Sequence, residues 1–287
     1  MSGRLVLVDD GVPRRTIDLL LHAAARSALA THVVRASQFV FADASQLTPG
    51  DLLYRPAVSS SAIRAERFLF GPGVIAFYND ADGVYFDLGD PYALFARAGV
   101  PTVLTVYCTS RRRQTLETLI QQVGGFPMVA KVPGGEGGVG VVRLDSRAAL
   151  FSFVDFVLCG GHTIQLMPFI PDATHIRAVV VGDRVVASYT NIVDSDDFRT
   201  TPSSRVEDYQ QSLSDELSAV AIAATRAVGV EFGGVDLLLD QDGRPHVLEV
   251  NFPCFHAQAE VVAGAPVSDA MVQHLLDKRQ RVLGVPT

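Results

Sequence analysis

The amino-acid sequence predicts a mixed α/β protein built from more than one compact unit. Its 287 residues exceed the roughly 100–200 residues of one ordinary domain. Hydrophobic residues make up 48% of the chain, which is enough to fill a sizeable core. Strand-like apolar runs alternate with helical patterns in the first third, and this alternation is typical of a small, mainly parallel sheet.

The first unit is expected to cover residues 1–86. Its predicted strands are the short apolar runs at residues 5–8, 32–34, 52–54 and 74–77. A first helix should follow Pro13, which is favoured at the start of a helix, and Ser59–Phe70 should form a second one. This order predicts a Rossmann-like α/β arrangement with its helices packed on the sheet.

Two further units are expected, at residues 87–166 and 167–287. Helices are predicted at residues 88–98, 115–123, 147–157 and 215–227. Strands are predicted at residues 126–132, 139–144, 163–166, 177–181 and 184–189. The polar stretch 191–211 has no periodicity and predicts a long loop, which in a compact domain is often functional.

A hairpin near the C-terminus carries the strongest chemical signal. Two apolar strands flank Asp242-Gly243, a sequence typical of a two-residue turn. Counting back from such a turn places Asp236 opposite Glu249, and Asn251 on the same face as Glu249.

Like charges that face each other across a ladder are destabilising, and burial makes this worse. A divalent cation removes the conflict, and carboxylate and amide oxygens suit Mg²⁺ or Mn²⁺. The pattern therefore predicts a metal site at Asp236, Glu249 and Asn251. The alternatives are a slipped register, or one acid at an exposed edge.

A glycine-dense loop is the second signal. Five of the seven residues 134–140 are glycine, and Lys131 lies on the strand before them. The dinucleotide-binding pattern is rejected because a strand, rather than a helix, follows the glycines. Glycines let backbone N–H groups approach phosphate oxygens, and Lys131, one of only two lysines in the chain, adds a positive charge.

These two features, in this order, resemble the ATP-grasp fold. The resemblance is closest to the branch with the ribosomal-protein glutamate ligases and the bacterial glutathione synthetases, and it covers roughly residues 87–283. It implies two α+β subdomains that grip ATP, the first with the glycine loop and the second with the metal site. Residues 1–86 would be the small domain that precedes the grasp.

The resemblance also implies roles for individual residues. Nucleotide binding is assigned to Lys131, Gly134, Gly135, Gly137, Gly138, Gln165, Leu166, Met167, Phe169 and Asp172. Catalysis is assigned to Lys131, Arg177 and Arg199, with Arg177 facing the transferred phosphoryl group. The sequence departs from the family in residues 87–90, where the second lysine of the ATP site is missing, and at Pro168, which lacks an N–H in the adenine-binding strand.

The implied activity is that of an ATP-dependent, ADP-forming ligase that makes C–N bonds through an acyl phosphate. Its substrates would be an amino acid, peptide or similar small molecule with a carboxylate, and an amine-type acceptor. Three alternatives stay open: a ligase that closes a ring within one substrate, a kinase of the same fold, and a nucleotide-binding module without turnover. Arg55, His175, Cys254 and His256 are favoured as structural residues.

Charge and hydropathy restrict the partners. The formal net charge of −7 argues against nucleic acid, because phosphates require a basic surface. No apolar run reaches the ~18 residues of a membrane helix, and the N-terminus does not resemble a signal peptide, so we expect a cytoplasmic protein. The cysteines are widely separated and predict neither zinc nor disulfides. A homo-oligomer remains possible.

Overall fold

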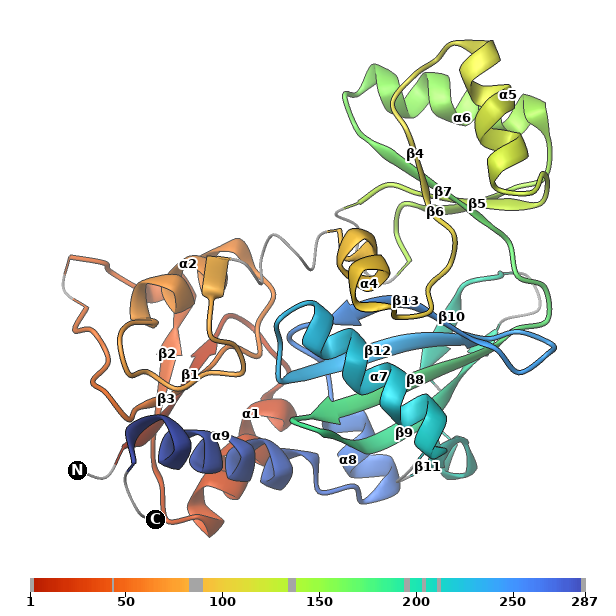
Figure 1. The fold of residues 1–287 in the computed structure, drawn as a ribbon. Helices are drawn as coiled ribbons and strands as arrows, with labels where there is room; N and C mark the ends of the chain where they lie inside the picture. Colours follow the sequence, from red (N-terminus) through yellow and green to blue (C-terminus); the bar gives the residue numbers. More distant parts are fainter. Residues whose placement is uncertain are drawn as a thin grey trace.

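Three β-sheets organise the described part of the chain, and Figure 1 shows them with their helices. The computed structural model describes residues 3–42, 44–82, 90–133, 138–193, 197–202, 205–210 and 213–284. The mixed α/β class predicted from the sequence is confirmed, with one parallel and two antiparallel sheets.

The first sheet is parallel, with the order β2-β1-β3. Its strands are β1 (Arg4–Asp9), β2 (Ala30–Arg35) and β3 (Leu52–Tyr54), and its flanking elements are α1 (Arg14–Arg26), η1 (Ala36–Gln38) and α2 (Ser60–Leu69). Helix α2 begins where predicted because the Ser59 hydroxyl accepts the Ala62 N–H at 3.1 Å. The strand predicted at 74–77 is wrong: only Ile75 makes an isolated parallel bridge, to Leu52.

The second sheet is antiparallel, with the order β4-β7-β5-β6. Its strands are β4 (Val106–Cys108), β5 (Met128–Lys131), β6 (Val141–Leu144) and β7 (Ile164–Pro168). Helices α5 (Arg113–Gln122) and α6 (Arg147–Cys159) cover one face, where alternate residues such as Ala130 and Leu166 are fully buried. The opposite face keeps Lys131 and Gln165, so it can serve a polar site.

The third sheet is the largest, with the order β10-β9-β8-β12-β13 and β11 pairing with β9. Its strands are β8 (Thr174–Val181), β9 (Arg184–Val193), β10 (Thr200–Pro202), β11 (Tyr209–Gln210), β12 (Phe232–Leu239) and β13 (Pro245–Asn251). Helices α4 (Tyr92–Ala98) and α7 (Asp215–Ala227) share a core on one face. The long loop predicted at 191–211 is wrong, because β9 extends to Val193, β10 and β11 pair back onto it, and η2 (Val206–Asp208) precedes β11.

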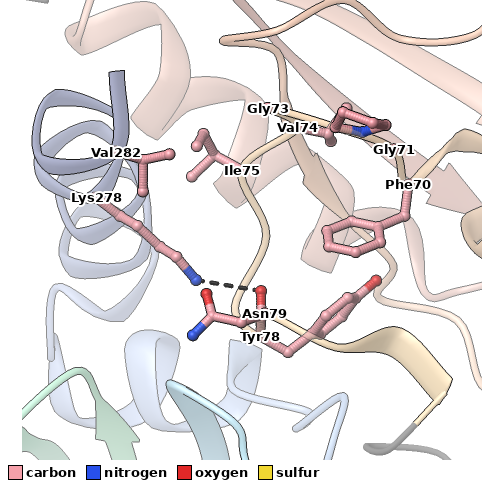
Figure 2. Close-up of a pocket in the computed structure, with 10 residues that line it drawn as sticks. Phe70, Gly71, Gly73, Val74, Ile75, Tyr78, Asn79, Lys278 and Val282 are labelled. Carbon is pink, nitrogen blue, oxygen red and sulfur yellow. Dashed lines mark hydrogen bonds between the residues drawn. The ribbon is translucent and has the colours of Figure 1, made fainter. Parts of the chain in front are cut away.

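Helices α8 (Ala257–Ala263) and α9 (Val267–Leu283) follow the last strand and were not predicted. Helix α9 flanks a cavity of about 440 Å³ beside residues 70–79 (Figure 2). The Lys278 ammonium, the second lysine of the chain, is held there by Ala76 O (2.8 Å), Tyr78 O (3.2 Å) and Glu231 (3.0 Å). It therefore has a structural role. No helix within the described residues is long and apolar enough to span a membrane.

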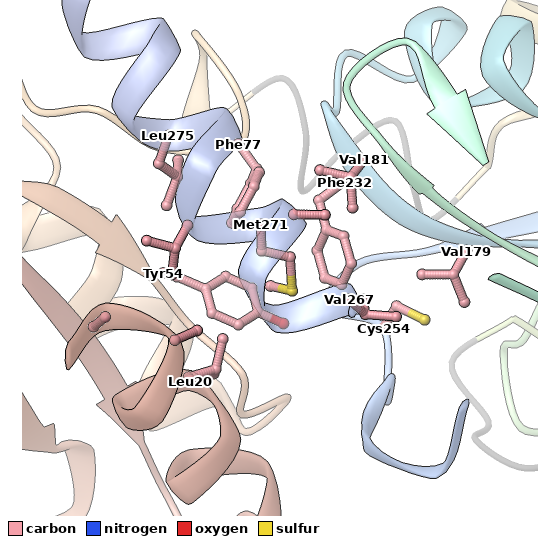
Figure 3. Close-up of a cluster of buried hydrophobic side chains, with 14 of the residues drawn as sticks. Leu20, Tyr54, Phe77, Val179, Val181, Phe232, Cys254, Val267, Met271 and Leu275 are labelled. Atoms are coloured by element: carbon pink, nitrogen blue, oxygen red, sulfur yellow. The ribbon is translucent and has the colours of Figure 1, made fainter. Parts of the chain in front are cut away.

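One hydrophobic core joins the first sheet to the third. Helix α9 contributes Met271 and Leu275, which pack between Tyr54 of β3 and Phe232 of β12 (Figure 3). The rings of Tyr54 and Phe232 lie 5.7 Å apart at an angle of 83°. Because these apolar contacts are continuous, the small parallel sheet is packed firmly against the strand that leads to Asp236. The division of the chain at residues 86 and 166 remains a prediction.

The buried pair of Arg55 and Glu66 stabilises the edge of the first sheet. Arg55 Nε donates to Glu66 Oε2 at 2.6 Å, and both side chains are almost fully buried. The Arg55 guanidinium also donates to Ala57 O and lies 5.8 Å from the Phe252 ring. Since its donors are engaged inside the protein, Arg55 is a structural residue, in agreement with the interpretation favoured from the sequence.

His256 anchors the segment after β13 to helix α9. Its Nε2 lies 3.1 Å from Ser268 Oγ, and that hydroxyl donates to Glu260 at 2.6 Å. Because the one hydroxyl proton goes to Glu260, Ser268 Oγ can only accept from Nε2, and the other ring nitrogen, Nδ1, lies 3.4 Å from the Cys254 carbonyl oxygen. Burial lowers the pKa of His256 to about 4, against a weaker opposing effect of the Cys254 carbonyl.

Acid should therefore destabilise the fold partly through His256. Its folded pKa lies below the ordinary value of 6.5, so the unfolded chain takes up this proton first as the pH falls. We expect the free energy of unfolding to drop between pH 6.5 and pH 4, by about 3 kcal/mol from this group. Urea unfolding at pH 7 and pH 4.5, on the parent protein and on His256→Gln, measures the difference. Parallel pH profiles for the two proteins would contradict the assignment.

Candidate active site

The hairpin of β12 and β13 brings the two predicted carboxylates opposite each other by an unexpected route. The turn is longer than two residues, because Asp240 N donates to Arg244 O at 3.1 Å, whereas a two-residue turn would pair Asp240 with Pro245. A β-bulge directly after Asp236 cancels this one-residue shift. Asp236 therefore faces Glu249. The predicted pairing is confirmed, and the predicted turn is wrong.

One row of side chains crosses five strands of the third sheet. Cross-strand partners along this row are Glu249 (β13), Asp236 (β12), Arg177 (β8), Tyr189 (β9) and Tyr209 (β11). Partners in register point to the same face of a sheet. The row therefore presents two acids, one base and an aromatic pair whose rings stack 4.8 Å apart at 28°.

Each carboxylate oxygen of Asp236 and Glu249 accepts a hydrogen bond. Arg177 binds Asp236 through two donors, with Nη2 at 2.8 Å from Oδ2. Lys131 Nζ donates to Glu249 Oε2 at 2.7 Å. The Asn251 amide lies between the acids, with Nδ2 at 3.0 Å from Asp236 Oδ2 and 3.2 Å from Glu249 Oε1. The four charges form a balanced network that Asn251 connects.

Burial and mutual repulsion make the two carboxylates unequal. Burial, together with repulsion from Glu249, raises the pKa of Asp236 to about 6 despite the opposing effect of Arg177. Burial also acts to raise the pKa of Glu249, but the Lys131 ammonium and the Asn251 amide outweigh it and lower this pKa. The ionised form of each acid therefore depends on the cation already bound to it, Arg177 for Asp236 and Lys131 for Glu249.

Lys131 reaches Glu249 from the second sheet and so connects the two antiparallel sheets. On its own sheet it belongs to a row with Gln165 of β7 and Tyr107 of β4. Met167 lies on the same face, two residues after Gln165, whereas the Leu166 side chain points into the core under α5 and α6. Of the residues predicted to bind the nucleotide on β7, Leu166 can therefore contribute only its backbone.

The predicted residues between β7 and β8 have partners of their own. The Phe169 ring carries the Arg143 guanidinium 4.4 Å from its centroid and packs edge-on against Phe198 at 6.2 Å. Asp172 adopts a left-handed backbone with φ of 52° and accepts a hydrogen bond from Gln241 at 2.9 Å. Phe169 thus lies in an aromatic cluster, while Asp172 is tied to the turn of the β12–β13 hairpin.

Arg199 lies beside the end of the glycine loop. Its Nη1 donates to Gly138 O at 3.3 Å, and its other nitrogens bind Asp197. Gly138 has a φ of 81°, and a Cβ there would lie 3.0 Å from Arg199 Cδ, so only glycine fits easily. Three further predicted loop residues, Gly134, Gly135 and Gly137, lie outside the described residues.

The oxygens of Asp236, Glu249 and Asn251 fit a small divalent cation. A half-turn of the Asn251 amide would present its oxygen, instead of Nδ2, to the space between the acids. Two carboxylates and one amide oxygen form a donor set suited to Mg²⁺ or Mn²⁺. In the part of the chain that the structure describes, no group of three or more histidines, cysteines or acids offers a competing site.

Cys254 and Gly234 pack behind Arg177, a contact that was not predicted from the sequence. The Cys254 thiol contacts the Arg177 guanidinium, and burial raises the pKa of Cys254 although Arg177 opposes this. A Cβ on Gly234 would lie 2.6 Å from Cys254 Sγ and 2.8 Å from Arg177 Nη1. The signal available in the sequence was the pair Gly233-Gly234 inside a strand, because glycine there often marks a close approach.

The chain is similar in sequence to proteins of a known family. The model of the RimK-like ATP-grasp domain matches residues 90–275. A "probable alpha-L-glutamate ligase" of Legionella pneumophila (strain Corby) is 33% identical over 160 residues, which are 55% of this chain and 52% of that protein. The chain therefore spans about half the length of this relative.

Solved structures with a similar fold cover nearly the whole chain. D-cycloserine synthetase DcsG aligns with a TM-score of 0.72 and 17% identity, over 95% of this chain and 100% of that one. The ATP-grasp ligase PsnB, in complex with a phosphomimetic precursor variant, Mg and ADP, aligns with a TM-score of 0.70 and 14% identity, over 97% and 99%. At these identities the likeness is one of fold.

Gly234→Ala should disturb Arg177 and destabilise the protein by about 1–3 kcal/mol, because the new methyl group overlaps buried atoms. Gly233→Ala is the matched control, since its Cβ would meet Val250 Cγ1 at 3.0 Å and Asn251 O at 3.4 Å. Adding Cys254→Ala to Gly234→Ala should restore part of the loss. Urea unfolding measures all three variants. A Gly234→Ala protein as stable as Gly233→Ala would contradict the packing argument.

Proposed function

This chain belongs to the RimK-like ATP-grasp family, and we propose that it is an ATP-dependent ligase that joins a carboxylate to an amine or related nucleophile. The carboxylate is activated as an acyl phosphate, with release of ADP and phosphate. Membership of the family agrees with the predicted fold: two antiparallel sheets meet at the Lys131–Glu249 contact, and a small parallel sheet precedes them. One observation supports the activity most strongly, namely the balanced set of two acids and two bases at one point between the sheets.

The reaction needs positive charge at that point. A carboxylate that attacks the γ-phosphate of ATP brings two anions together, so catalysis depends on fixed cations placed where negative charge develops. Lys131 and Arg177 lie on either side of the acids, within hydrogen-bond distance of Glu249 and Asp236. Phosphoryl oxygens bound beside the acids would therefore lie close to both cations.

A divalent ion would add to this charge. Asp236, Glu249 and Asn251 would hold Mg²⁺ or Mn²⁺, which supplies a positive charge to the phosphate oxygens. Arg177 is kept in position by its two bonds to Asp236 and by the Cys254 thiol behind it. We assign to Arg177 the stabilisation of the transferred phosphoryl group, and to Lys131 a contact with the phosphates.

The nucleotide would lie along the face of the second sheet that carries Lys131. Gln165, Met167 and Phe169, with the backbone of Leu166, would contact the base, and Asp172 would contact the ribose. Gly138 and the predicted Gly134, Gly135 and Gly137 would bring backbone N–H groups to the phosphates. Arg199, bound to Gly138 O, lies close enough to the loop to contact substrate or phosphate.

The substrates would be amino acids or peptides. The similar proteins include a probable glutamate ligase, a D-cycloserine synthetase and a ligase complexed with a precursor peptide variant. A carboxylate donor and an amine acceptor fit this range, and glutamate is the first acceptor to test. The test is a panel of amino acids and short peptides, with phosphate release and product mass as the readouts. A condensed product supports the ligase, a loss of water from one substrate indicates ring closure, and a phosphorylated product indicates a kinase.

Lys131→Met and Glu249→Gln should each reduce substrate-dependent ADP release by about 100-fold or more, because each removes a charge that acts on the phosphates. Arg147→Met is the matched control, since Arg147 is an exposed partner of Glu117 on α6 and lies outside the site. A coupled assay for ADP gives the rates, and thermal unfolding verifies the fold of each variant. Near-parental ADP release in both site variants would refute the proposed roles.

A further inference from the structure

The candidate metal ligands are already bound by protein cations. Lys131 donates to Glu249 Oε2 at 2.7 Å, and Arg177 binds both oxygens of Asp236. Asn251 presents its amide N–H groups to both acids. Two negative side chains thus face two positive ones, so the site has no excess negative charge to offer a free cation.

A divalent ion entering on its own would meet opposition. It would need the Glu249 oxygen that Lys131 occupies, and it would bring two positive charges close to an ammonium group in a partly buried site. A triphosphate changes this balance, because it brings several negative charges and alternative acceptors for Lys131. Each of the two, the ion and the nucleotide, therefore lowers the electrostatic free-energy cost of binding the other at this site.

Lys131 is the cation that can exchange. Its side chain is 28% exposed, reaches across from the second sheet and makes one hydrogen bond to the acids. Arg177 is 19% exposed, makes two bonds and is fixed in register beside Asp236 on the same sheet. A single, more exposed contact breaks at lower cost than a paired one on a neighbouring strand.

We infer that Lys131 competes with the divalent ion for Glu249, so that this site takes the metal–nucleotide complex as one ligand and binds the metal ion alone weakly. The inference rests on the proposed function, because it concerns the ligand of the same site. It assigns Lys131 two successive acceptors, first Glu249 and then a phosphate oxygen. The exchange breaks one hydrogen bond and forms another, and no covalent bond changes.

The experiment measures Mn²⁺ binding to the full chain by electron paramagnetic resonance, with and without a non-hydrolysable ATP analogue. The parent protein should bind Mn²⁺ alone at least about tenfold more weakly than Mn²⁺ with the analogue. Lys131→Met should bind Mn²⁺ alone about tenfold more tightly than the parent, because the competitor is gone. Lys131→Gln, which keeps a polar side chain, should show the same gain and serves if the methionine variant does not fold.

Arg147→Met is the control, because it removes one exposed cation and changes the net charge equally. It should leave Mn²⁺ binding at the parental value. If the parent binds Mn²⁺ with the analogue but neither Lys131 variant gains affinity for Mn²⁺ alone, the exchange is overturned while the proposed function stands. If the parent fails to bind Mn²⁺ together with the analogue, the proposed function is overturned as well.

Discussion

The repulsion between Asp236 and Glu249 is the constraint on which the architecture of the site depends. Two carboxylates that face each other on neighbouring strands destabilise a ladder unless cations compensate them. Arg177 compensates one from the adjacent strand, and Lys131 compensates the other from a different sheet. Compensation of these two negative charges therefore accounts for a contact within the third sheet, Arg177 with Asp236, and for a contact between the second and third sheets, Lys131 with Glu249.

The first sheet contributes by packing. The ring of its Tyr54 lies 5.4–6.3 Å from the rings of Phe77, Phe232 and Phe252, and Phe252 directly follows Asn251. Helix α9 fills the space between the two sheets. The small parallel sheet is thereby held against the end of the strand that carries Glu249 and Asn251. Burial of apolar surface does not depend on direction. Here it holds in place a site whose hydrogen bonds and ion pairs do depend on direction.

The hairpin shows how far local patterns determine geometry. Alternation on β12 and β13 correctly predicts that Asp236 faces Glu249, with Asn251 beside them. The turn was mispredicted by one residue, and a bulge after Asp236 restored the pairing. Neither feature has a strong signal of its own in the sequence. Packing of one face against α4 and α7 selects the register that keeps Val235 and Leu237 buried and leaves the acids together on the opposite face.

The sequence by itself determined the α/β class, most of the strands and helices, and the residues of the acidic hairpin and of the Lys131 strand. These features depend on local spacing and residue type, and both can be read directly from the amino-acid sequence. Only the tertiary structure decided that Lys131 reaches Glu249, 118 positions away, and that Gly234 makes room for Cys254 behind Arg177. It also decided that α9 joins two sheets. Such contacts depend on how separate elements pack, because the shape of a shared core is a property of all the elements that bury it.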